Sequence, residues 1–596
     1  MPVDLDPHPV HASVPLGALR PVAETRGAAS GAIGADLDRA GTALAAGQLQ
    51  PATDLVWAAL ARDPDHPRAL GMLGQLAIFM GQHEAALVPL QRAVARDPRL
   101  EFRIWLCLCL EQLGRHGEAL GLLGAIIDTV PQTANAHFAV GLVLERFGCL
   151  EHAVALYERC IALDPERADA RHRYGRALQA TGRFEAAIEA YTGAIRRCAT
   201  EAACFADLSA ALSSVGRFET AYAAAKIAAQ LDPHGAEACN NVGHALLSLN
   251  RSAEAVGWYE KAIALRQDYA TARFGHAVAL LKSGDFARGW REYEWRWRDC
   301  QTPRTDLDVP AWQGEPIEGR AILLHAEQGL GDTLQFVRFA SVVAARGARV
   351  VLEVPRPLVR LLGRVDGVCE VIACGEPIPP VDLHCPMASL PRILDLRLQT
   401  IPGGPYLRGT EKDGEGVAAP RPGAELVVGL VWAGDPRKGQ MRSNLIDRRR
   451  SVPLEMLSPL FGIEGVRYLG FQLGEARNQI GTCGGAVADA MDGVRDFADT
   501  AERLAAVDLL ISVDTSMVHL AGGLGLPVWM MSRFDGCWRW LEHRADTPWY
   551  PSMRIFRQPA PGDWLSVVRA VRAALLAHGR DGAPAAQPGA VVSGAQ

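Results

Sequence analysis

Four polar residues near the C-terminus have types and spacing suited to binding an anion. They are Asp514, Thr515, Ser516 and His519. Apolar runs before residue 514 and after Gly525 predict a strand, a short helix and a second strand of one parallel sheet. Asp514 stands at the expected N-cap, and i+3 and i+4 spacing places the other three side chains on one helical face. Since helix N-termini present free N–H groups at the carboxyl ends of such strands, the site is suited to phosphate. A capped structural helix with a packed histidine is the alternative.

A second candidate lies where an expected strand over residues 321–325 turns into a helix over residues 333–346. Gly329 and Gly331 permit a tight strand-to-helix turn of the kind that binds phosphate, although the full G-x-G-x-x-G spacing is absent. Asp332, which ends this turn, is suited to capping the helix.

A third candidate is the basic stretch after the strand expected over residues 426–432. Its cations are Arg437, Lys438, Arg442, Arg448, Arg449 and Arg450. Most charge runs are solvated surfaces, but this stretch is expected to be a loop at the carboxyl end of a strand next to residues 514–519. Fixed cations and helix N–H groups can stabilise the negative charge of a diphosphate without a metal.

The elements before residue 300 repeat with a period of 33 or 34 residues. The recurring turn residues are Gly47, Gly81, Gly114, Gly148, Gly182, Gly216, Asn250 and Gly284. Small residues recur seven positions earlier at Gly74, Gly141, Gly175, Ser209 and Gly243, and after the turn at Ala85, Ala119, Ala153, Ala187, Ala221 and Ala255. This pattern of paired helices is typical of the tetratricopeptide repeat (TPR), with eight units.

A TPR solenoid has a concave groove that usually binds peptide or protein. No residue type recurs in this groove, so a spacer or a dimerisation surface is the alternative. Trp290, Tyr293 and Trp297 share one helical face and are expected to cap the solenoid against the next domain, rather than to stack on a sugar or base. Trp312 is expected to pack on that domain from the linker.

Composition narrows the class of protein. The chain has 596 residues, a net charge of −6 and thirteen cysteines without a C-x-x-C pair. Nucleic-acid binding, a zinc site and a disulfide framework are therefore not indicated. No apolar stretch reaches 18 residues, and residues 1–33 lack the order of a secretory signal, so a cytoplasmic protein with no membrane span is expected.

The sequence Asp-Thr-x-x-x-His-Leu-Ala-x-x-x-Gly-x-Pro at residues 514–527 resembles the nucleotide-sugar motif of the heptosyltransferase-like glycosyltransferases, family nine, which have the GT-B fold. Bacterial proteins with TPR repeats before such a domain are similar over nearly the whole chain. The protein O-GlcNAc transferases are more distantly similar in architecture, but their asparagine ladder is absent: the corresponding positions hold Trp105, Ala139, Arg173, Asp207 and Asn241.

The resemblance implies roles for particular residues. Asp332 would be the general base towards an acceptor hydroxyl, in a single displacement with inversion. Arg450, three positions before Pro453, would contact phosphate, with Arg449 as a substitute. The remaining donor-site residues would be Lys438, Glu475 near the ribose, Asp514, Thr515, Ser516 and His519. Gln328, Gly331 and Trp538 could line the cleft between the two halves, and Glu327 would stand beside it. No role is assigned to Arg539.

The implied fold class is an α solenoid followed by an α/β GT-B fold with two Rossmann-like domains. We expect a disordered N-terminus (1–33), the TPR solenoid (34–300), a linker (301–319), the first Rossmann-like half (320–408), a hinge (409–424), the second, nucleotide-sugar-binding half (425–578) and a disordered tail (579–596). An amphipathic helix over residues 563–577 would cross back to the first half.

The resulting hypothesis is a metal-independent glycosyltransferase that needs no cofactor. A nucleotide sugar would be its donor substrate, and the TPR groove would recruit a protein or glycan acceptor. Two alternatives remain open. One is a non-catalytic TPR scaffold with a degenerate GT-B module, and the other is a nucleotide-sugar epimerase.

Overall fold

The computed structural model describes residues 30–299, 307–409 and 425–581. The described chain divides into two compact units, a first unit that ends at Ala211 and a second unit that begins at Leu212. The first helix begins at Ser30, so the prediction of disorder over residues 1–33 is wrong for residues 30–33. The rest of that segment, the linker residues 301–306, the hinge residues 410–424 and the tail from residue 582 lie outside the described residues.

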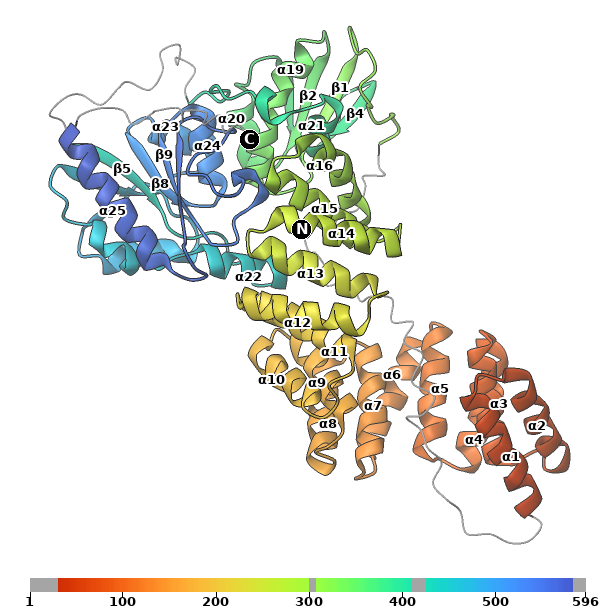
Figure 1. Cartoon of the computed structure of the whole chain (residues 1–596). Coiled ribbons are helices and arrows are strands. Elements are labelled where there is room, and N and C mark those ends of the chain that lie inside the picture. The colour runs from red at the N-terminus through yellow and green to blue at the C-terminus, as the bar shows by residue number, and fades with distance from the viewer. Residues whose placement is uncertain (1–29, 300–306, 410–424, 582–596) are drawn as a thin grey trace, which may run out of the picture. The chain divides into compact units, whose positions relative to one another are not determined.

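Paired helices make up the repeat region (Figure 1). The pairs are α1 (Ser30–Ala45) and α2 (Leu49–Arg62), α3 (Pro67–Phe79) and α4 (His83–Arg96), α5 (Leu100–Gln112) and α6 (His116–Ile127), α7 (Ala134–Arg146) and α8 (Leu150–Leu163), α9 (Ala168–Ala180) and α10 (Phe184–Ile195), α11 (Ala202–Ser214) and α12 (Phe218–Leu231), α13 (Ala236–Ser248) and α14 (Ser252–Leu265), and α15 (Ala270–Ser283) and α16 (Phe286–Glu292). The described residues therefore contain the eight predicted units. The last three residues of α11, and α12 to α16, belong to the second unit.

The predicted turn residues adopt the backbone conformation that their types allow. All eight have positive φ, from 57° at Asn250 to 94° at Gly284. Left-handed backbone of this kind is readily adopted by glycine and tolerated by asparagine, which explains why these types recur. The turn prediction is confirmed.

The predicted close helix contacts are also present. A Cβ built on Gly141 would lie 2.6 Å from the ring of Tyr157, and one on Gly175 would lie 2.6 Å from the ring of Tyr191. One expectation is wrong by a residue: Ala86, five positions after Gly81, is fully buried, whereas Ala85 is exposed.

The first α/β region has a four-stranded parallel sheet in the order β3-β2-β1-β4. Its strands are β1 (Ala321–His325), β2 (Arg349–Val354), β3 (Val368–Ala373) and β4 (Leu383–Pro386). The single helix predicted over residues 333–346 is instead α18 (Leu330–Phe336), a 3-10 turn and α19 (Ala340–Ala344). The short helices α20 (Val359–Leu362) and α21 (Leu390–Ile393) complete this region.

The second α/β region has a six-stranded parallel sheet in the order β10-β9-β8-β5-β6-β7. Its strands are β5 (Leu426–Val431), β6 (Val466–Gly470), β7 (Val487–Asp489), β8 (Leu509–Val513), β9 (Val528–Ser532) and β10 (Met553–Arg557). The sequence did not predict β7 or β10. The helices are α22 (Met441–Arg450), α23 (Phe497–Leu504), α24 (Ser516–Leu524) and α25 (Trp564–Asp581).

Helix α25 packs on the second sheet (Figure 1). Trp564, Val568 and Val571 lie in one buried cluster with residues of β5, β8 and β9. The expectation that this helix crosses back to the first half is therefore wrong, because its apolar face is already used. The helix also includes residues 579–581, which were predicted to be disordered.

The aromatic stripe after the last repeat packs as predicted. Trp290 and Tyr293 are buried in the same cluster as Trp312 and Phe336 of the first α/β region. Short helical segments over Tyr293–Trp295 and Arg296–Asp299 (α17) carry this face. The prediction of a cap is confirmed for Trp290 and Tyr293, whereas Trp297 is only partly buried. In the part of the chain that the structure describes, no helix has both the length and the apolar character of a membrane span.

Candidate functional site

Helix α24 begins one residue later than the sequence suggested. Its N-cap is Thr515, whose hydroxyl accepts a hydrogen bond from the Met517 N–H over 3.3 Å. Asp514 is therefore not the N-cap. Its Oδ2 instead accepts from Nε1 of Trp540 over 2.9 Å. Thr515 and Ser516 remain partly exposed at the carboxyl edge of the second sheet, where an anion could approach the helix.

His519 is buried among aromatic rings. It stacks on Trp540 with 5.4 Å between ring centroids, and its Nδ1 lies 2.8 Å from the Tyr550 hydroxyl. Burial, together with Arg539 and Arg338, lowers the pKa of His519 well below 6.5. A neutral imidazole provides no positive charge for a phosphate, so the geometry favours the packed-histidine alternative.

Asp332 lies in the first turn of α18, three residues after the N-cap. The N-cap is Gly329, whose N–H donates to Oδ2 of Asp332 over 2.9 Å. The expectation that Asp332 itself is the N-cap is therefore wrong. Its Oδ1 forms an ion pair with Arg539 of the second α/β region, and Nε of Arg539 also donates to Gln335.

The two predicted sites meet where α18 packs against α24. A Cβ built on Gly331 would lie 2.9 Å from Cδ2 of His519 and 3.5 Å from Cα of Ser516. Only a residue without a side chain permits this approach. The Gly-Asp turn of the first sheet and the start of α24 are thus in direct contact.

Residues 441–450 of the basic stretch form a helix, α22, rather than the predicted loop, and this separates the cations on it. Arg450 donates to the carbonyl of Asp514 over 3.1 Å and forms an ion pair with the buried Asp447. Arg449 points elsewhere, because adjacent residues on a helix are about 100° apart. It donates to the carbonyls of Ser213 and Ser214 at the end of α11, so it does not reach the contacts made by Arg450.

Other predicted donor residues lie at the surface. Lys438 and Glu475 are both exposed and form an ion pair with each other, 2.8 Å between Nζ and Oε1. Arg437 belongs to the predicted basic stretch but was not given a donor-site role. Its Nη2 would lie 3.7 Å from a Cβ built on Gly329. This cation of the second region therefore reaches the Gly-Asp turn of the first.

The three residues predicted to line the cleft are engaged in packing. Gln328 hydrogen bonds with the Tyr293 hydroxyl, Gly331 contacts His519, and Trp538 is buried against Trp290 with 5.2 Å between ring centroids.

Glu327 is also held by the capping segment. Both of its carboxylate oxygens lie 3.1 Å from Nη2 of the fully buried Arg296. Burial raises the pKa of Glu327 to about 7 even though Arg296 attracts the ionised form.

Arg539 is the main site residue that sequence reasoning did not assign. A single arginine between two tryptophans in the sequence is compatible with many surface or core positions. Only its ion pair with Asp332 in the structure places it at the candidate site. Within residues 30–299, 307–409 and 425–581, no three His, Cys, Asp or Glu side chains form a group that could hold a metal ion.

Comparisons with known proteins agree with the repeat region. Family models described as tetratricopeptide repeat match residues 43–100 and 149–197, 72–134, and 236–269. The repeats are tetratricopeptide repeats. These matches lie before the α/β regions, which the models do not cover.

Protein FlbA of Caulobacter vibrioides is 25% identical over 396 residues. The match covers 58% of this chain and 62% of that protein, so less than two thirds of the relative's length is spanned.

Solved structures of other proteins match part of the chain. YrrB, described as a TPR protein with an unusual peptide-binding site, is 18% identical and covers 30% of this chain and 91% of its own, with a TM-score of 0.26. Yeast Tom70 is 15% identical and covers 48% of this chain and 64% of its own, with a TM-score of 0.34.

Proposed function

We propose that the chain is a GT-B glycosyltransferase that moves a sugar from a nucleoside-diphosphate sugar to an acceptor hydroxyl. One observation carries the proposal: the Asp332 turn of one parallel sheet touches the start of α24 on the other, next to Arg450 and Arg437. Ligands of open α/β sheets bind at the carboxyl ends of the strands. Two such edges that face each other could bind a donor on one side and an acceptor on the other.

The second α/β region would hold the donor. The partly exposed residues Thr515 and Ser516 are the N-cap and the first residue of α24, and Arg450 lies at the adjacent Asp514 carbonyl. Together they would stabilise the negative charge that develops on the diphosphate as the sugar leaves. His519 would orient α24 through its ring contacts rather than by carrying charge.

Asp332 would accept the proton of the acceptor hydroxyl as that oxygen attacks the anomeric carbon from the face opposite the diphosphate. Each carboxylate oxygen can accept more than one hydrogen bond, so the bonds from Gly329 and Arg539 leave acceptor capacity. The ion pair with Arg539 would fix the orientation of Asp332. The TPR repeats would recruit a protein or glycan acceptor.

Calorimetric titration with UDP, GDP, ADP and CMP tests the donor site. We expect one nucleotide to bind with a micromolar Kd, and Arg450→Ala to weaken it at least about tenfold, as expected for loss of a charge-assisted hydrogen bond. Arg467→Ala is the matched control, because Arg467 lies at the start of β6 at the opposite edge of the same sheet and is exposed. Equal losses in both variants would contradict the assignment.

A second candidate function, a non-catalytic scaffold, is favoured by the pairing of the site charges within the chain. Asp332 pairs with Arg539, Arg450 with Asp447 and Lys438 with Glu475. A site that has lost its ligand could be stabilised in this way. Absence of binding by all four nucleotides at millimolar concentration would support the scaffold over the transferase.

A further inference from the structure

Residues 533–543, which follow β9, contact the last TPR repeats; we call them the bridging segment. The Phe534 ring stacks on Phe218 of the repeats with 6.2 Å between centroids, and its carbonyl accepts from Nδ2 of Asn250 over 2.9 Å. Glu542 accepts from the Ser252 hydroxyl over 2.5 Å and lies 3.8 Å from Nζ of the buried Lys282. Both ends of the segment are therefore attached to the repeats.

The middle of the same segment contacts the candidate site. Arg539 pairs with Asp332, and Trp540 donates to Asp514 while stacking on His519. Only one residue, Leu541, separates Trp540 at the site from Glu542 at the repeats. The anchor of Glu542 on the repeats and the contacts of the Trp540 ring are therefore joined by a very short length of backbone.

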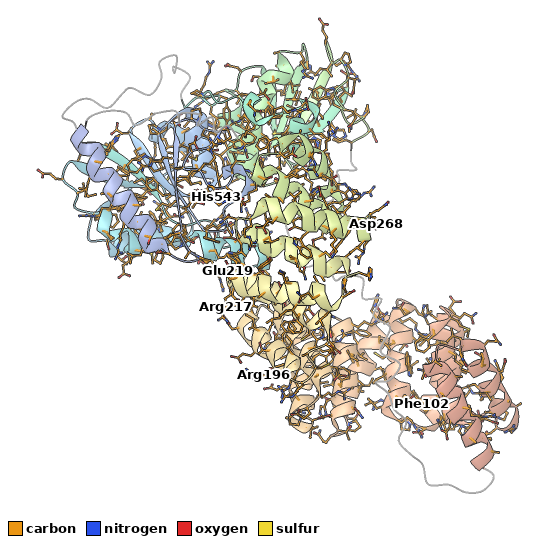
Figure 2. The ribbon with its side chains drawn as sticks, viewed as in Figure 1. Phe102, Arg196, Arg217, Glu219, Asp268 and His543 are labelled. Carbon is orange, nitrogen blue, oxygen red and sulfur yellow. The ribbon has the colours of Figure 1, made fainter. Side chains whose placement is uncertain are left out.

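Leu541 is held in a strained conformation. Its φ of 51° and ψ of −173° lie in a region that is essentially restricted to glycine, and it is only 5% exposed. His543, labelled in Figure 2, also has a positive φ, of 54°. A leucine keeps this backbone only where its neighbours are fixed on both sides, here by the anchors of Trp540 and Glu542.

A parallel connection runs through α22. Arg449 donates to the carbonyls of Ser213 and Ser214 and lies 3.2 Å from Oδ2 of Asp535 in the bridging segment. The next residue, Arg450, donates to the Asp514 carbonyl. Two adjacent arginines thus join the repeats and the candidate site through one helix.

We propose that Glu542 is a positioning residue for this site. Its anchor on Ser252 and Lys282 holds Trp540 and Arg539 against α24 and Asp332, so that a change in α13 to α15 is transmitted to the site. That the site binds a nucleotide rests on the proposed function, whereas the mechanical connection does not.

Hydrogen exchange of the full-length chain, read by mass spectrometry, tests the connection without a ligand. In Glu542→Ala we expect exchange to rise about tenfold in peptides covering residues 329–335 and 513–519, because opening equilibria of packed elements become more favourable. Ser252→Ala, which removes the partner on the repeat side, should act in the same direction. Glu542→Gln keeps a hydrogen-bond acceptor for Ser252 and should restore most of the protection.

Glu254→Ala is the matched control, since Glu254 lies on α14, the helix that also carries Ser252, and pairs with Arg251 at the surface. It should leave both site peptides unchanged. If exchange in Glu542→Ala rises only in α13 to α15 and residues 540–543, the proposal is overturned. If Glu542→Ala destabilises the whole fold, exchange will also increase in β1 and β5. In that case the exchange of the site peptides in Ser252→Ala tests the proposal.

Nucleotide titration of the same variants separates this proposal from the proposed function. If wild type binds a nucleotide, Glu542→Ala should weaken Kd about tenfold and Glu254→Ala should not. If wild type binds none, the proposed function fails while the exchange result still decides the connection. Unchanged Kd together with unchanged site exchange would overturn the positioning role.

Discussion

Arg539 forms an ion pair with Asp332 across the contact between the two α/β regions. Asp332 comes from the turn after β1, and Arg539 follows β9, so the pair joins the carboxyl edges of the two sheets. The carboxylate proposed as general base therefore has its orientation set by the other region. Separation of the two regions would release it.

Loss of the arginine should destabilise the chain markedly. Side-chain exposure is 10% for Arg539 and 26% for Asp332, so Arg539→Met leaves a mostly buried carboxylate without its cation. We expect a loss of about 3 kcal/mol in the free energy of unfolding, measured by denaturant titration. Arg544→Met, which breaks an exposed pair with Asp546, should cost less than about 1 kcal/mol. Similar losses in the two variants would contradict a larger contribution of the Arg539–Asp332 pair to stability.

A methyl group at residue 331 should separate the two regions. In Gly331→Ala the added Cβ would meet the His519 ring, which cannot move because it is stacked on Trp540. We expect about 1–3 kcal/mol of destabilisation from this overpacking. Gly404→Ala is the control, since no atom lies within 4 Å of its added Cβ. A melting temperature equal to that of wild type in Gly331→Ala would contradict this contact.

Glycines inside the repeat helices should divide into two classes. Gly141→Ala places a Cβ 2.6 Å from the buried Tyr157 and should destabilise the repeats by about 1–3 kcal/mol. Gly121→Ala lies on the exposed face of α6 with open space around it, and should stabilise by about 0.5–1 kcal/mol. Thermal unfolding followed by circular dichroism measures both. Changes of the same sign would refute the predicted difference in packing.

His519 should make the protein sensitive to acid. Burial lowers its pKa well below 6.5, so the native histidine stays neutral while the unfolded chain takes up a proton near pH 6.5. The unfolded state binds more protons as the pH falls, so this group removes stability below about pH 6.5. When the pH is lowered from 7.5 to 5.5, the free energy of unfolding should fall by about 1.4 kcal/mol less in His519→Gln than in wild type, as measured by denaturant titration at the two pH values. Parallel pH profiles would mean that the native histidine takes up its proton at the same pH as in the unfolded chain, and would contradict this prediction.

Lys282 should make the stability of the protein depend on pH in the alkaline range. Burial lowers its pKa to about 8, although Glu542, Asp535 and Cys537 favour the charged form; Arg533 disfavours it. The unfolded lysine titrates near pH 10.4, so the unfolded state binds more protons between pH 8 and 10, and stability rises with pH. Relative to Lys282→Met, wild type should gain about 2 kcal/mol over that range. Denaturant titrations at the two pH values measure this difference, and a constant difference would contradict it.

Local patterns were sufficient for most elements. The turn residues from Gly47 to Gly284 were predicted because a positive φ selects glycine or asparagine at one position of each repeat. Strands β1, β8 and β9 were predicted because parallel strands buried along their whole length are mainly apolar runs. Strand β7 is a three-residue edge strand, too short to give such a pattern.

Spacing along the chain could not determine the direction of neighbouring charges. Arg449 and Arg450 are adjacent in a basic run, but the helix of α22 directs one to the end of α11 and the other to Asp514. The sequence grouped them because it could not show whether the run was a loop or a helix.

By itself, the sequence determined the TPR repeats, most of the parallel strands and the two turns that carry Asp332 and Asp514, since each depends on residue types at local spacing. Only the tertiary structure decided that Arg539, 207 positions from Asp332, pairs with that carboxylate and that Glu542 contacts Ser252 of the repeats. Such pairs depend on packing between distant elements, and the same residue types occur at many positions where no partner is near.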